Sequence, residues 1–80
     1  MMEREALDQA LLDAHGRNDL EGLVRLYTHA ADEAEARQEI EAANFYLTHA
    51  FVFALEGGAA EAAPLNKRLA ARGCAKLLDF

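Results

Sequence analysis

The chain has 80 residues, of which 14 are acidic and 8 basic, so its formal net charge at pH 7 is −6. This negative charge repels the phosphates of nucleic acids and anionic lipid head groups, which argues against nucleic-acid and membrane partners. Ala and Leu dominate a hydrophobic fraction of 52%, and both residues favour helix. Length and composition together predict a single all-α domain across residues 1–80.

The cysteine content and the first residues indicate a cytoplasmic protein. Cys74 is the only cysteine, so no disulfide forms within the chain. The start Met1-Met2-Glu3-Arg4-Glu5 has neither the basic region nor the apolar run of an export signal. The most apolar stretch, residues 45–55, is shorter than the roughly 20 residues that a membrane-spanning helix needs.

The first two predicted helices cover residues 3–15 and 18–36. In the first, Leu7, Ala10, Leu11 and Ala14 recur at helical spacing, and we expect Gly16 to form a left-handed cap. The second starts with Asn18 as its N-cap, and Glu21 is placed to bond back as in a capping box. Its apolar arc comprises Leu20, Leu23, Val24, Leu26, Tyr27, Ala30, Ala31 and Ala34.

An internal repeat predicts where the chain reverses. Leu26-Tyr27-Thr28-His29-Ala30 recurs twenty residues later as Tyr46-Leu47-Thr48-His49-Ala50. Twenty residues rotate a helix by about 200° beyond whole turns. In one straight helix, the apolar stripes before and after Arg37 would therefore point to opposite sides. We predict a tight reversal at residues 36–38, although neither Gly nor Asn marks it. An unbroken helix in a swapped dimer is the alternative.

The third and fourth helices are predicted over residues 38–56 and 60–72, followed by a short C-terminal tail. Gly57-Gly58 ends the third helix, and Pro64 belongs in the first turn of the fourth, which Gly73 closes. The expected core positions are Ile40, Ala43, Tyr46, Leu47, Ala50, Phe51, Phe53, Ala54, Ala62, Leu65 and Leu69, and in the tail Leu77, Leu78 and Phe80 are candidates for docking.

Charge is divided unevenly along the chain. Residues 1–61 contain thirteen acidic and four basic residues, whereas residues 62–80 contain four basic residues and one acidic residue. This division permits the last helix to lie against acidic neighbours or to steer a partner of mixed charge, but we expect ordinary solvated helix faces.

Two helical hairpins with Ala-rich packing faces resemble the tetratricopeptide-like repeats, in their long-helix variety. The resemblance rests on Gly16, Gly57-Gly58 and the stretch Glu41-Ala42-Ala43-Asn44-Phe45-Tyr46-Leu47, and it spans roughly residues 12–73. The Trp-Leu-Gly signature of the family and the Pro after its second helix are missing here. The resemblance implies a scaffold that binds proteins or peptides and not a catalyst. Because such arrays usually stack about three repeats or more, a second copy could supply the missing neighbour.

The strongest candidate site is a strip on the third helix. Phe45, His49, Val52 and Glu56 follow i, i+4, i+7, i+11 spacing and are predicted to face outward. Exposed aromatic residues at helical spacing indicate a partner interface or a homodimer interface. The alternative is that the fourth helix or the tail covers them.

Other residues give weaker indications of chemistry. His29 and Glu33 lie one turn apart and could share a metal ion, but structural zinc takes four ligands, so no metal or cofactor is predicted. Cys74 follows a helix C-terminus, where an anionic thiolate is disfavoured. We therefore predict no enzymatic activity. Two alternatives to an interaction module remain: an antitoxin-like regulatory subunit whose acidic residues 32–41 mask a basic surface, and, more remotely, a helical-bundle metalloenzyme, although the paired Glu-x-x-His motifs are missing.

Overall fold

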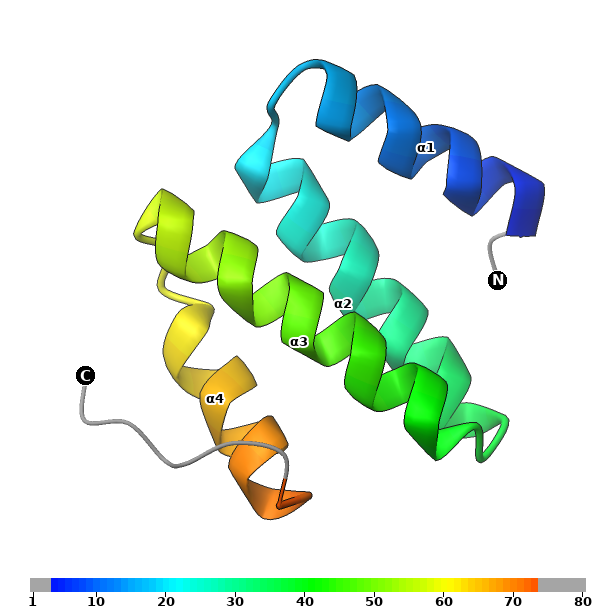
Figure 1. Cartoon of the computed structure of the whole chain (residues 1–80), viewed down its shortest axis with the longest axis vertical. Helices are drawn as coiled ribbons and strands as arrows, with labels where there is room; N and C mark the ends of the chain where they lie inside the picture. Colours follow the sequence, from blue (N-terminus) through cyan, green and yellow to red (C-terminus); the bar gives the residue numbers. More distant parts are fainter. Residues whose placement is uncertain (1–3, 74–80) are drawn as a thin grey trace.

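Four helices make up the computed structural model, which describes residues 4–73. They are α1 (Arg4–Gly16), α2 (Leu20–Ala36), α3 (Ile40–Gly57) and α4 (Ala62–Ala71), as Figure 1 shows. No strand occurs in this part of the chain. The predicted all-α fold of two helical hairpins is confirmed, and each helix begins and ends within two residues of its predicted position.

Each helix packs against the next one along the chain. The packed pairs are α1 with α2, α2 with α3, and α3 with α4, and α2 with α3 is the most extensive of them. The result is a flat molecule of 34 × 29 × 14 Å, in which α1 and α3 lie on either side of α2 (Figure 1). One broad surface of α3 is therefore available between its contacts with α2 and with α4.

The three turns between the helices repeat the same geometry every twenty residues. Asn18, Gln38 and Gly58 have φ angles of 54°, 62° and 64°. In each turn the next amide donates back to a buried alanine carbonyl: Asp19 N to Ala14 O at 2.9 Å, Glu39 N to Ala34 O at 2.9 Å and Ala59 N to Ala54 O at 2.8 Å. This is the hydrogen bond of a Schellman motif, which closes a helix around a left-handed residue. The predicted reversal at residues 36–38 is confirmed, and a helix that continues through Arg37 is excluded.

The first turn differs in detail from the prediction. Gly16 remains within α1, and Asn18 is the left-handed residue. Asp19 is the N-cap of α2, and its Oδ1 atom accepts a hydrogen bond from Gly22 N at 3.0 Å. The predicted capping box of Asn18 and Glu21 is therefore wrong. Asn adopts the left-handed conformation more readily than most residues, which leaves the capping role to the next side chain.

The core lies where the four apolar stripes meet. Its buried residues are Ala14, Leu23, Val24, Tyr27, Ala31, Leu47, Ala50, Ala54, Ala62, Leu65 and Leu69. The predicted stripes of α2 and α4 are confirmed. Ile40 was predicted as a core residue, but 51% of its surface is exposed. It is the first residue of α3, one turn before the point where Arg72 reaches Asn44, so α4 ends before it covers Ile40.

Ion pairs hold α4 against the acidic end of α2. Arg68 Nη2 lies 2.8 Å from Asp32 Oδ1 and 2.7 Å from Glu35 Oε1. Arg72 also pairs with Glu35, and its Nη1 donates to Asn44 Oδ1 at 3.0 Å. The basic last helix therefore lies against acidic neighbours, and the expectation of solvated faces is wrong for Arg68 and Arg72. The docking predicted for residues 77–80 lies outside the described residues.

Candidate partner-binding face

The strip predicted on α3 lies on the outward side of this helix. Phe45 is 57% exposed and Val52 43% exposed, Glu56 is exposed, and His49 is half-buried. Leu55, close to Val52 on the helix, is also exposed. The uncovered side of α3 is therefore apolar over several turns, and α4 does not cover it.

His49 connects the strip to the body of the molecule. Its ring centroid lies 4.3 Å from that of Phe45 and 5.1 Å from that of Tyr27. Its Nδ1 atom is 2.9 Å from the carbonyl oxygen of Phe45, which places the neutral ring's proton on Nδ1, donating to that oxygen. These contacts fix the imidazole, so Phe45 is held against an ordered surface.

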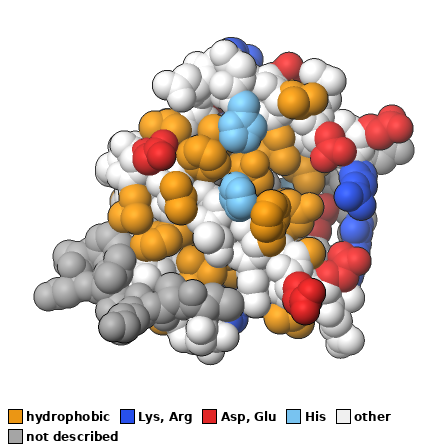
Figure 2. Space-filling model, in the orientation of Figure 1, with side chains coloured by type: hydrophobic (Ala, Val, Ile, Leu, Met, Phe, Trp, Pro, Cys, Tyr) orange, Lys and Arg blue, Asp and Glu red, His pale blue; other side chains and the backbone are white. Residues whose placement is uncertain are grey.

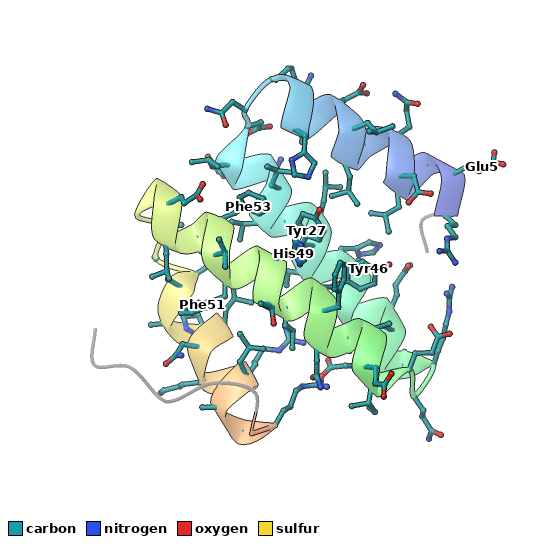
Figure 3. All side chains as sticks on the ribbon, in the orientation of Figure 1. Glu5, Tyr27, Tyr46, His49, Phe51 and Phe53 are labelled. Atoms are coloured by element: carbon teal, nitrogen blue, oxygen red, sulfur yellow. The ribbon has the colours of Figure 1, made fainter. Side chains whose placement is uncertain are left out.

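Rings from three helices extend this surface into what we call the aromatic face: His15 of α1, Tyr27 of α2, and Phe45, Tyr46, His49 and Phe53 of α3. Tyr27 and Phe53 stack with centroids 5.8 Å apart, and His15 meets Phe53 edge-on at 5.6 Å. Figure 3 shows Tyr27, His49 and Phe53 clustered where α2 passes behind α3. In the space-filling view, hydrophobic side chains surround the two histidines on this side of the molecule (Figure 2).

Tyr27 is the central residue of the aromatic face. Its hydroxyl lies 3.1 Å from His15 Nε2, so a hydrogen bond links α1 to α2. Burial raises the pKa of the Tyr27 hydroxyl above its ordinary value, and nearby Tyr46 adds a smaller contribution in the same direction. The hydroxyl therefore stays protonated at neutral pH, and Tyr27 contributes an uncharged ring to the face.

Sequence reasoning identified the α3 part of this face and missed the part that α1 supplies. His15 is 38 residues from Phe53 in the sequence, and no local pattern relates them. No signal within α1 identifies His15, because its ring contacts depend on how α1 packs against α2.

A small polar cleft lies at one end of the face. It has a volume of about 180 Å³ and is lined by residues that include Arg4, Asp8, Glu33, Arg37 and Tyr46. Acidic and basic side chains both line it. The cleft is therefore a charged edge of the face and not an extension of its apolar surface.

The residues considered for chemistry form no site among those described. His29 Nε2 lies 3.3 Å from Glu33 Oε1, as their spacing suggested, but within residues 4–73 no three His, Cys, Asp or Glu side chains come together as metal ligands do. Cys74 lies outside the described residues.

Comparisons of the chain with family models, with curated proteins and with solved structures found no match. Within residues 4–73, no helix combines the length and the apolar character needed to cross a membrane.

Proposed function

We propose that the chain is a protein-interaction module that binds a protein partner, or a second copy of itself, through Phe45, His49, Val52 and Glu56. One observation supports this proposal above all: α3 exposes Phe45, Val52 and Leu55 on the side that faces away from its buried residues. The outward side of a surface helix ordinarily carries charged and polar residues. Large apolar side chains gathered there favour a partner surface.

The arrangement of the exposed residues matters more than their number. Leu12 on α1 is 66% exposed, but single surface leucines are common and need no partner. Phe45 and Val52 instead lie two turns apart on one side of α3, and the ring of His49, from the turn between them, contacts that of Phe45. Covering the exposed half of each side chain is worth about 1 kcal/mol per residue. Two such residues supply the apolar centre of a modest interface.

The tetratricopeptide-like resemblance is part of the same proposal. The turns that recur every twenty residues, and helices that pack mainly on their chain neighbours, support it. A stack of this kind presents extended surfaces for binding and leaves an uncovered face wherever the stack ends.

The alternative of an acidic subunit that masks a basic partner has less support. Asp32 and Glu35 belong to the acidic segment in question, and both are already paired with Arg68. Glu39 and Glu41 remain exposed. Part of the negative charge that such masking requires is thus already paired inside the molecule.

The test compares Phe45→Asp/Val52→Asp with Ile40→Asp, a matched control. Ile40 is as exposed as Phe45 on the same helix, but nine residues from His49 it lies about 180° away around the axis. Sedimentation velocity measures self-association, and affinity capture followed by identification of the bound proteins measures partner binding. We expect the double variant to lose the association that the wild type shows, whereas Ile40→Asp retains it. Circular dichroism must show native helix content in both variants. Association that survives the double substitution in a folded protein would overturn the proposal.

A further inference from the structure

We propose that the segment that docks on α3 is a basic amphipathic helix of about four turns, with a cationic residue near each end of its apolar stripe. This inference rests on the proposed function and adds the chemistry of the partner. It follows from the charges at the two ends of the strip.

The carboxylates of α3 bracket its exposed apolar residues. Glu41 lies four residues before Phe45, and Glu56 lies four residues after Val52, so both are on the side of the strip. Both are exposed, and neither forms an ion pair with another described residue. The helix contains no Lys or Arg. At 1.5 Å per residue, the two carboxylates stand about 22 Å apart along the axis.

Among the described residues, no Lys or Arg forms an ion pair with Glu41 or Glu56. Arg68 and Arg72 of α4 pair with the end of α2, and Arg25 lies beside Glu21. Acidic side chains are visible around the hydrophobic centre of the face in Figure 2. A Lys or Arg of a partner placed near Glu41 would also lie about one turn from the ring of Phe45, where a cation–π contact adds to the ion pair.

The same charges disfavour a second copy of the chain along α3. If two α3 helices paired in parallel, Glu41 would face Glu41 and Glu56 would face Glu56. In antiparallel pairing, Glu41 of each copy would face Glu56 of the other. Both arrangements place like charges together and leave four carboxylates without a cation. A partner with cations at those two positions satisfies them and covers the same apolar residues.

A helix fits this surface better than an extended strand. The described residues contain no sheet edge to which a strand could add. The exposed residues of α3 follow i, i+4, i+7 spacing, which an apolar stripe on a second helix matches along its length. About 16 residues of helix reach from Glu41 to Glu56.

The test uses three synthetic 18-residue peptides with the same leucine stripe on a Gln/Ala background. The first carries two Lys residues 15 positions apart, the second carries the same two Lys residues at its centre, and the third carries Glu at the end positions. Binding to the intact chain is measured by fluorescence anisotropy at low and at high salt. We expect the end-lysine peptide to bind tightest and to lose affinity with salt, because exposed ion pairs are screened.

Three variants of the chain separate the charge from the apolar contribution. Glu41→Gln/Glu56→Gln should weaken binding of the end-lysine peptide about fivefold at low salt, the effect of losing two exposed ion pairs. Glu61→Gln, which removes an exposed carboxylate beyond α3, should change nothing. Phe45→Asp/Val52→Asp should abolish binding of all three peptides.

The outcomes test the basic-helix inference separately from the proposed interaction function. Equal affinity for the end-lysine and end-glutamate peptides, or no peptide binding, would overturn the basic-helix inference. The proposed function would then still stand if association in sedimentation or capture depended on Phe45 and Val52. A homodimer that requires these two residues would also reject the basic helix while it upholds the function.

Discussion

At the residue scale, Tyr27 connects three helices. It stacks on Phe53 of α3, accepts the edge of His15 from α1, and belongs itself to α2. Its hydroxyl orients the packing of these rings, because a hydroxyl that is largely shielded from water needs a hydrogen-bond partner in the protein. Tyr27 therefore helps to set the position of α1 relative to α3, together with the contact of His15 with Phe53.

Tyr27→Phe removes the hydroxyl and keeps the ring. The variant loses the hydrogen bond to His15, so we expect the free energy of unfolding to fall by about 1 kcal/mol. Urea denaturation followed by circular dichroism measures the change. Tyr46→Phe is the matched control, since no hydrogen bond of the Tyr46 hydroxyl contributes among the described residues, and its midpoint should stay within the error of the wild type. Equal losses in the two variants would contradict the assigned role.

Tyr27 also predicts how stability depends on alkaline pH. The pKa of its hydroxyl in the folded chain is raised above the ordinary value of 10.0, so above this pH the folded state holds a proton that the unfolded state has lost. The contribution of Tyr27 is complete below pH 10 and is lost as pH rises through the folded pKa.

The measurement is the urea midpoint at several pH values between 8 and 11. Tyr46→Phe should lose only the smaller contribution that Tyr46 makes to this pKa, so its midpoint should fall with pH nearly as the wild type does, whereas Tyr27→Phe should fall clearly less steeply. Identical slopes for Tyr27→Phe and the wild type would show that burial of this hydroxyl does not control the alkaline transition.

At the element scale, the turns offer a test of the twenty-residue repeat. Gln38 has a φ of 62°, a left-handed conformation that costs a non-glycine residue about 1–2 kcal/mol. Gln38→Gly relieves this cost but adds freedom to the unfolded chain, so the net gain should be roughly 0.5–1 kcal/mol. Gly58→Ala, at the equivalent position with a φ of 64°, should lose about 1 kcal/mol. Thermal denaturation of both variants checks the opposite signs, and a loss in Gln38→Gly would contradict the shared geometry.

The turns and the aromatic face show which features could be predicted from the sequence and which could not. The phase difference between two apolar stripes located the reversal at residues 36–38, because burial on one side is a global constraint that a local signal need not mark. The choice between Gly16 and Asn18 as the left-handed residue was wrong, since it depends on which amide reaches the carbonyl of Ala14. The α3 strip was predictable from spacing within one helix. The contribution of His15 was not, because it depends on how α1 lies across α2.

The attachment of α4 provides a prediction about ion pairs. Arg68 lies within 2.8 Å of both Asp32 and Glu35 and is only 32% exposed at its side chain. Because the group is partly shielded and bonds to two carboxylates, Arg68→Ala should cost about 1 kcal/mol, at the upper end for surface pairs. Lys67→Ala on the exposed side of α4 is the control, and it should change stability little. Raising the salt concentration should shrink the difference between these two variants, and a difference that is insensitive to salt would point to lost packing.

At the scale of the whole molecule, the helices differ in the number of neighbouring helices against which they pack. The two central helices each pack against two neighbours, whereas α1 packs mainly on α2 and α4 mainly on α3. Where helices pack mainly on their neighbours along the chain, stability is roughly a sum of the units and of the interfaces between them. The end helices are therefore expected to open without the centre, and the uncovered strip on α3 stays in place when they do.

Leu7→Ala and Leu47→Ala test this difference with the same chemical change at two positions. Leu7 is 7% exposed and fixes α1 to α2, whereas Leu47 is fully buried in the centre of α3. Each substitution removes apolar packing worth about 2–5 kcal/mol. Leu7→Ala should accelerate hydrogen exchange of the α1 amides and leave those of α2 and α3 protected, because only the α1 interface weakens. Leu47→Ala should accelerate exchange in all four helices, because every interface depends on the central pair. If Leu7→Ala lowered protection equally throughout, the four helices would unfold as one unit, and the end helices would be as stable as the centre.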